Sequence, residues 1–244
     1  MLSKRISRYI KSLQLKKYRK QENSFIVEGT KGVIELLKSN FQTQTIVYTK
    51  KIDNELFTPF SLEGVELIET NQKELEQIGT FQTNNSVLAV ATTKPNDPVD
   101  VGNELILALD DVRDPGNLGT IIRIADWYGI KKILCSSETA DFYNPKVINA
   151  TMGSFTRVEA FYTNLHEFLK KTDLPIYGAL LEGENIYNQE LSQKGILVMG
   201  NESHGIGREM KSLITHPLNI PRRGGAESLN VSIATAVILD NFFR

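Results

Sequence analysis

The second half of the chain consists of short apolar runs separated by segments with helical periodicity. Strands are predicted at residues 105–109, 133–135, 157–161, 176–180, 196–199 and 218–220. After the first run, apolar residues recur at helical spacing and predict a helix that ends at Gly129. Further helices are predicted at residues 145–152 and 229–243. Strands this apolar are buried on both faces, so the pattern predicts a parallel sheet with helices on both sides.

The first part of the chain has a shorter version of the same alternation. Strands are expected at residues 25–27, 45–49, 65–68 and 87–91, and one helix is expected at residues 31–38. Another helix is expected after Asn71, because Glu74 follows three residues later in a capping-box pattern. The two prolines of residues 92–100 disfavour helix and mark a linker. We therefore expect a small α/β domain at 1–92, a linker at 93–100 and a larger domain at 101–244.

Composition excludes several classes of protein. The 41% apolar and 23% charged residues are typical of a globular chain, and no run approaches the roughly 18 apolar residues of a membrane span. Lys11 interrupts the short apolar stretch near the start, which disfavours a signal peptide. The single cysteine, Cys135, precludes an intramolecular disulfide, and the histidines lack metal-ligand spacing. A cytoplasmic protein without a bound metal is expected.

Positive charge is concentrated in the first 20 residues, although the net charge is only −1. Ile6, Ile10 and Leu13 keep helical spacing, so the cations between them would project from a packed helix. Such cations would contact RNA phosphates and supply affinity rather than sequence reading. The candidate RNA contacts are Lys4, Arg5, Arg8, Lys11, Lys16, Lys17 and Arg19. The alternative is a solvated terminal helix that keeps the protein soluble.

A strand–loop–helix segment covers residues 220–234. The predicted strand ends at Pro221, two adjacent glycines follow, and a helix is expected to open at Ser228. Ser228 and Asn230 would place short hydrogen-bonding side chains near the start of that helix. The arrangement is typical of a ligand site, but it is equally that of an ordinary connection with an N-cap.

Two further motifs allow this segment to be interpreted. Residues 117–123 have the pattern N-x-G-x-x-x-R, residues 200–205 read G-N-E-x-x-G, and residues 220–234 read I-P-x-x-G-x-x-x-S-L-N-V-S-x-A. In this order they resemble the three signature motifs of the SpoU (TrmH) family of RNA ribose 2′-O-methyltransferases, part of the SPOUT superfamily. Residues 1–92 look, more loosely, like the L30e-like substrate-binding domain attached to many members. The resemblance implies a deep trefoil knot in the C-terminal domain and a homodimer formed through the last helix.

The resemblance also implies S-adenosylmethionine as the cofactor. By motif position, its contacts are Met199, Gly200, Ile220, Pro221, Leu229 and Asn230. Gly200 and the glycines at 224 and 225 fit a close approach of the backbone to adenosine. The alternative for Ile220 and Leu229 is core packing.

The catalytic residues implied by the motifs are Asn117, Arg123, Glu202, Ser228 and Asn230. In the family this arginine has been proposed as the base for the 2′-hydroxyl. A guanidinium stays protonated in proteins, which favours phosphate binding or alkoxide stabilisation for Arg123. A surface salt bridge is the alternative. Asn117 would cap its helix or orient Arg123 and the ribose. Glu202 would bond Arg123 or a substrate group, and the alternative is a solvated loop glutamate. For Ser228 and Asn230 the alternative is helix capping.

These observations favour methyl transfer to a ribose 2′-hydroxyl of structured RNA. Ribosomal RNA is preferred over tRNA, because the additional N-terminal domain resembles that of ribosomal RNA members. Two alternatives are a tRNA methyltransferase and an inactive RNA-binding member of the family. A third, a generic nucleotide-binding α/β enzyme, lacks both the glycine-rich dinucleotide fingerprint and the phosphate-loop pattern.

Overall fold

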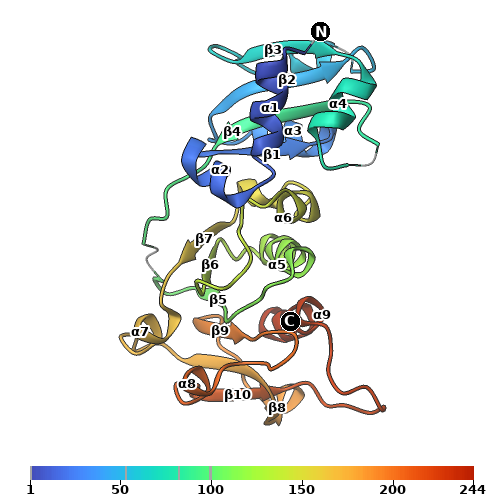
Figure 1. Cartoon of the computed structure of the whole chain (residues 1–244). Helices are drawn as coiled ribbons and strands as arrows, with labels where there is room; N and C mark the ends of the chain where they lie inside the picture. The colour runs from blue at the N-terminus through green and yellow to red at the C-terminus, as the bar shows by residue number, and fades with distance from the viewer. Residues whose placement is uncertain (1, 53, 82, 99–100) are drawn as a thin grey trace. The chain divides into compact units, whose positions relative to one another are not determined.

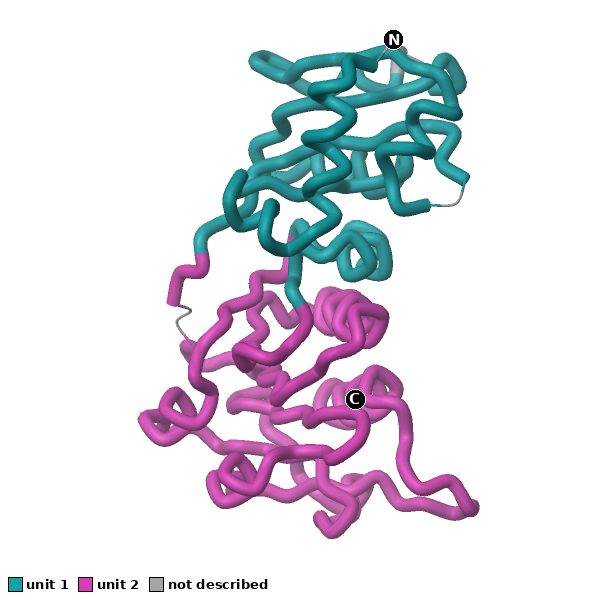
Figure 2. The backbone as a smooth tube through the Cα atoms, in the orientation of Figure 1, with its two compact units in different colours: residues 1–95, 141–156 teal, residues 96–140, 157–244 magenta. Residues whose placement is uncertain are grey.

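The computed structural model describes residues 2–52, 54–81, 83–98 and 101–244. The chain divides into two compact units (Figure 2). Unit 1 comprises Met1–Pro95 and Asp141–Thr156, and unit 2 comprises Asn96–Ala140 and Arg157–Arg244. The chain therefore returns to unit 1 at residues 141–156, which the sequence analysis assigned to the C-terminal domain. Of the expected linker, residues 99 and 100 lie outside the described residues.

Unit 1 is built on a mixed sheet. Its strands, in spatial order, are β1 (Ser24–Glu28), β4 (Val87–Thr92), β2 (Thr43–Thr49) and β3 (Glu66–Thr70). The α1 (Lys4–Ser12) and α4 (Gln72–Ile78) helices cover one face, where Ile10 and Leu75 pack with Ile26 and Leu88. The expected capping box is confirmed in part, because Asn71 Oδ1 accepts from Glu74 N at 3.0 Å.

Aromatic packing on the other face of this sheet explains why residues 141–156 join unit 1. The helices of this region are α3 (Thr30–Leu37), α6 (Pro145–Ala150) and the 3-10 turn η2 (Ser154–Thr156). The Phe25 ring lies 4.7 Å from that of Tyr143 and 5.9 Å from that of Phe155, measured between centroids. Phe25 neighbours Ile26 in β1, and neighbouring strand residues point to opposite faces. β1 therefore contributes side chains to the core on both faces of the sheet of unit 1.

The basic N-terminus forms two helices instead of one. The α1 helix ends at Ser12, and α2 (Lys16–Glu22) begins after a short break. Arg19 is only 3% exposed, and its Nη1 donates to the carbonyls of Leu13 and Gln14 at 2.9 Å. Its Nε also donates to Asp141 Oδ2 at 3.0 Å. The prediction that Arg19 contacts RNA is therefore wrong, because its guanidinium is buried and already bonded within unit 1.

Unit 2 is built on a sheet in which every pair of neighbouring strands is parallel, which confirms the sequence prediction. The spatial order is β10 (His216–Asn219), β8 (Ile176–Asn185), β9 (Gly195–Met199), β5 (Leu105–Leu109), β6 (Lys132–Cys135) and β7 (Glu159–Tyr162). Figure 1 shows helices on both sides of this sheet. On one side lie α5 (Pro115–Trp127) and α9 (Val231–Phe243), and on the other α7 (Leu165–Leu169) and α8 (Arg208–Lys211).

The parallel sheet brings three loops to one edge. Because the carboxyl ends of parallel strands share an edge, the segments after β5, β9 and β10 all emerge there. These segments are residues 110–114, 200–207 and 220–230. The first leads into α5, which carries the first motif, and the other two carry the second motif and most of the third. Among the described residues, no helix is long and apolar enough to cross a membrane.

Candidate functional site

The first motif begins at the N-terminus of α5. Asp114 is the N-cap, and its Oδ1 accepts from the backbone N of Asn117 at 2.8 Å. Pro115 occupies the first helical turn, where a missing N–H has no cost. The suggestion that Asn117 caps this helix is therefore wrong. Since Asp114 performs the capping, the amide side chain of Asn117 is available for other contacts.

A chain of hydrogen bonds joins one residue from each motif. Asn117 Nδ2 donates to Glu202 Oε1 at 2.8 Å, and Asn230 Nδ2 donates to Asn117 Oδ1 at 2.9 Å. Glu202 and Asn230 are exposed, and Asn117 is half-buried. The chain is directional, because each asparagine amide donates toward the carboxylate. The three loops thus present one polar surface, with a negative charge at one end, to whatever binds at this edge.

Asn230 is also the N-cap of α9. Its Oδ1 accepts from the backbone N of Ser232 at 2.9 Å and, more weakly, from that of Ile233 at 3.4 Å. The helix therefore begins at Val231, and the expectation that it opens at Ser228 is wrong. Ser228 is exposed, and its side chain has no hydrogen-bond partner in the part of the chain that the structure describes. Helix capping thus applies to Asn230 but not to Ser228.

Arg123 lies apart from this chain of hydrogen bonds. Six residues at about 100° each place it about 120° around the α5 axis from Asn117. Its side chain is exposed and has no hydrogen-bond or ion-pair partner among the described residues. Glu202 is bonded to Asn117, not to Arg123 as one sequence hypothesis held. The salt-bridge alternative for Arg123 is likewise absent among these residues, and its guanidinium faces solvent.

The second motif forms a tight loop after β9. Asn201 and Gly205 exchange backbone hydrogen bonds of 3.0 and 2.9 Å. A Cβ at Gly200 would lie 2.2 Å from Gly205 C, so the loop itself requires glycine here. Met199 is only 2% exposed, and its carbonyl accepts from Asp110 N at 2.8 Å. Its side chain is therefore part of the core, which leaves only its backbone for contact with a cofactor.

The third motif is open to solvent. Ile220 and Pro221 are half-buried, and Leu229 is 50% exposed, so core packing does not explain Leu229. A Cβ at Gly224 or Gly225 would have no neighbour within 4 Å. An exposed apolar side chain beside the polar Asn230, at the carboxyl edge of a parallel sheet, fits a ligand with apolar and polar parts. S-adenosylmethionine is such a ligand.

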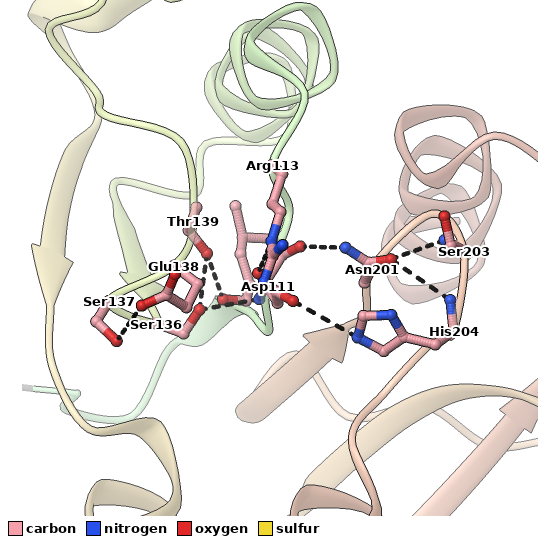
Figure 3. A network of polar contacts seen from close by, with 10 residues as sticks. Asp111, Arg113, Ser136, Ser137, Glu138, Thr139, Asn201, Ser203 and His204 are labelled. Atoms are coloured by element: carbon pink, nitrogen blue, oxygen red, sulfur yellow. Dashed lines mark hydrogen bonds and ion pairs between the residues drawn. The ribbon is translucent and has the colours of Figure 1, made fainter.

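A second polar network, shown in Figure 3, was not predicted from the sequence. Asp111 has φ 65°, and its Oδ1 accepts from Arg113 Nε at 2.6 Å. This hydrogen bond, followed by the charge of Asp111, raises the pKa of Arg113. His204 Nε2 lies 3.5 Å from Asp111 Oδ2. The available signal was an aspartate two residues after an apolar strand, because aspartate tolerates the left-handed conformation.

The remaining predicted contacts lie on the surface of unit 1. The side chains of Lys4, Arg5, Arg8, Lys11, Lys16 and Lys17 are all exposed. They are therefore available for phosphate contacts, in contrast to Arg19. In the described part of the chain, no group of three or more His, Cys, Asp or Glu side chains could hold a metal ion.

Models of known protein families match both parts of the chain. Residues 104–240 match the model of the SpoU rRNA Methylase family, and residues 4–89 match the MRM3-like substrate binding domain. The chain is 31% identical to the 23S rRNA (guanosine(2553)-2′-O)-methyltransferase RlmP of Bacillus subtilis, over 94% of this chain and 92% of that protein.

Two solved structures are similar over nearly the whole chain. One is a protein of the TrmH family from Porphyromonas gingivalis, with a TM-score of 0.88, 36% identity and coverage of 99% of this chain and 98% of that one. The other is an AdoMet-bound rRNA methyltransferase from Sinorhizobium meliloti, with a TM-score of 0.89, 30% identity and coverage of 99% and 95%.

Proposed function

We propose that this chain, which belongs to the SpoU rRNA methylase family, transfers a methyl group from S-adenosylmethionine to a ribose 2′-hydroxyl of ribosomal RNA. The observation that carries the proposal is the Glu202–Asn117–Asn230 chain of hydrogen bonds. It joins all three motifs at the edge of the sheet where open α/β folds bind ligands. The similarity to an AdoMet-bound rRNA methyltransferase over nearly the whole chain supports the choice of cofactor.

The cofactor contacts come from the second and third motifs. S-adenosylmethionine, when bound, supplies a methyl group on a positively charged sulfur. Gly200 and the backbone of Met199 would hold it from one side, and Ile220, Pro221 and Leu229 from the other. Exposed apolar surface at Leu229 would be covered in the process, which contributes affinity. Asn230 adjoins this region and also takes part in the Glu202–Asn117–Asn230 hydrogen bonds.

The catalytic contacts would come from the polar chain and from Arg123. Glu202, Asn117 and Asn230 orient the ribose, and Ser228 adds a hydroxyl from the third motif. Arg123 carries a permanent positive charge at the surface, so it would bind the target phosphate or stabilise the forming alkoxide. When bound, S-adenosylmethionine would give its methyl group to the ribose oxygen and leave as the neutral thioether, and the proton of the 2′-hydroxyl would pass to solvent water. Fixed donors aimed at the oxygen lower the barrier because they need no reorganisation.

The proposal extends to the rest of the molecule. Unit 1 recruits RNA through the exposed cations of α1 and α2, in keeping with its match to a substrate-binding domain. Unit 2 contains a deep trefoil knot and pairs with a second copy through α9. Trp127 and Ile233, on the two helices of that side, are 84% and 53% exposed and support such pairing. The protein acts in the cytoplasm and needs no metal.

The direct test is to map 2′-O-methylation in ribosomal RNA from cells with and without the gene. One ribose should lose its methyl group in the deletion strain and regain it when purified protein and S-adenosylmethionine are added to the unmodified RNA. The reaction should proceed equally in a chelator. If the methyl group is lost only from tRNA, then tRNA and not ribosomal RNA is the substrate. If the protein transfers a methyl group to neither RNA, the alternative of an inactive RNA-binding protein holds.

A further inference from the structure

The loop that carries Glu202 is tied at both ends to one dipeptide. At its start, Asn201 Nδ2 donates to the carbonyl of Asp111 at 2.7 Å. At its end, Gly207 N donates to Asp110 Oδ2 at 2.8 Å. Asp110 and Asp111 directly follow β5 and precede α5, the helix that carries Asn117. The position of the loop relative to Asn117 is therefore set through this dipeptide.

The side chain of Asn201 both stabilises the turn and connects it to Asp111. Its Oδ1 accepts from Ser203 N at 2.8 Å and from His204 N at 3.4 Å, which closes the turn around Glu202. Its Nδ2 provides the bond to Asp111. One half-buried amide thus folds the turn with one end and attaches it to the segment between β5 and α5 with the other (Figure 3).

Asp111 is a rigid point of attachment. Its backbone N donates to Ser136 Oγ at 2.9 Å, and Ser136 Oγ lies 3.0 Å from Thr139 Oγ1. Thr139 Oγ1 in turn donates to the Leu109 carbonyl at 3.0 Å, at the end of the buried strand β5. The Asp111 carboxylate also contacts His204, which belongs to the same turn as Asn201. The tether therefore connects an exposed turn to the core of unit 2.

We propose that Asn201 is a positioning residue for methyl transfer, which holds Glu202 in reach of Asn117 through its bond to the Asp111 carbonyl. Glu202 is exposed, and the other side-chain attachments of its loop to this dipeptide are the bond at Gly207 and the longer His204–Asp111 contact. Without the bond from Asn201, Glu202 would therefore sample more positions. The Glu202–Asn117 hydrogen bond would then form only part of the time. This role rests on the proposed function, since it concerns the same reaction.

The substitution Asn201→Asp separates the two halves of the amide. A carboxylate still accepts from Ser203 N and His204 N, but it cannot donate to the Asp111 carbonyl. Asn96 provides a matched control in the same unit. Its Nδ2 donates to the Tyr162 carbonyl at 2.9 Å, and its Oδ1 accepts from Tyr162 N at 2.8 Å. Asn96→Asp removes the same kind of bond away from the motifs.

We expect Asn201→Asp to lower kcat by about 10- to 100-fold with little change in the KM for RNA, since a small misplacement of a catalytic group has effects of this size. Asn96→Asp should leave kcat unchanged. A double-mutant cycle with Glu202→Ala tests whether Asn201 acts through Glu202. If it does, Asn201→Asp costs little more once Glu202 is gone. Additive losses, or an Asn201→Asp enzyme as active as the Asn96→Asp control, would overturn the proposal.

A crystal structure of the Asn201→Asp protein gives a readout independent of activity. The turn should move away from Asp111, and the hydrogen bond between Glu202 and Asn117 should be lost. A variant that keeps this hydrogen bond overturns the positioning role, whether or not the wild type methylates RNA. A wild type that transfers no methyl group to any RNA would overturn the proposed function, while the crystal structure would still decide the role of Asn201.

Discussion

Asn230 and Asn117 lie on different motifs, and the Nδ2 of Asn230 donates to the Oδ1 of Asn117 at 2.9 Å. The other end of the Asn230 side chain caps α9. One amide thus fixes the start of the last helix and its relation to the start of α5. The two contacts of Asn230 can be separated by substitution, because each depends on a different side-chain atom.

We predict that Asn230→Asp keeps the fold but loses activity. Aspartate is as good an N-cap as asparagine, so the thermal midpoint should stay close to that of the wild type. The donor to Asn117 disappears. If Asn117 rotates its amide to donate to the new carboxylate, it can no longer donate to Glu202, so the chain is broken in either orientation. Methyl transfer should fall at least tenfold, equivalent to about 1.4 kcal/mol in the barrier.

Asn230→Ala is the companion variant. It removes the cap as well, which should cost about 1 kcal/mol of stability in addition to the loss of activity. Thermal unfolding and a single-turnover transfer assay distinguish the two effects. A fully active Asn230→Asp protein would show that the contact with Asn117 has no part in catalysis.

For Arg123 we predict a loss of transfer without a loss of fold. Because the side chain is exposed and makes no contact among the described residues, Arg123→Ala should change the free energy of unfolding by less than about 0.5 kcal/mol. Cofactor affinity, measured by calorimetry, should be unchanged. Arg123→Lys keeps the charge but loses the planar donor fork and should remain badly impaired. Arg208, exposed on α8, is the control, and Arg208→Ala should be active. Substantial activity in Arg123→Ala would remove this residue from the mechanism.

Arg19 leads to a stability prediction for unit 1. Arg19→Ala would leave Asp141 and the carbonyls of Leu13 and Gln14 without their donor. Breaking a buried ion pair in this way costs about 3–5 kcal/mol, which chemical denaturation would detect. Lys20→Ala, next to it but exposed, should cost less than about 0.5 kcal/mol. Equal stability of the two variants would contradict the structural role of Arg19.

Several local signals were read correctly from the sequence. The β5 strand spans the predicted residues because its apolar run is buried on both faces. Asn71 caps the predicted helix because its partner is three residues away. The start of α9 was misplaced because Ser228 and Asn230 are both good caps. The choice between them depends on Asn117, which lies in another motif.

Long-range contacts explain the other differences. The burial of Arg19 depends on Asp141, and the return of residues 141–156 to unit 1 depends on packing against Phe25. Neither partner is visible from sequence spacing. The motifs identified the residues of the site, but the bond from Glu202 to Asn117 instead of Arg123 is set by the tether of the 200–207 loop.

The exposed cations of α1 and α2 should control the salt dependence of RNA binding. Replacing Lys16 and Lys17 by glutamine removes up to two phosphate contacts, and each lost contact should reduce the slope of log affinity against log salt by about 1. The double variant Arg208→Gln/Lys211→Gln on α8 is the control, since it also removes two exposed positive charges. The measurement is RNA affinity over a series of salt concentrations. An unchanged slope for the double variant would place the RNA contacts elsewhere.

The last prediction concerns the second copy of the chain. Ile233 lies on the solvent side of α9, and Trp127 at the end of α5 is largely exposed. Apolar side chains of this size are expected to be covered when two copies pair. Sedimentation equilibrium should find a dimer for the wild type and a monomer for Ile233→Asp, whose charge cannot be buried without a partner. Leu67→Asp, which places the same charge on an exposed leucine of β3 in unit 1, should remain dimeric. A wild type that is monomeric at micromolar concentration would remove the dimer from the proposal, and a dimeric Ile233→Asp protein would move the interface away from α9.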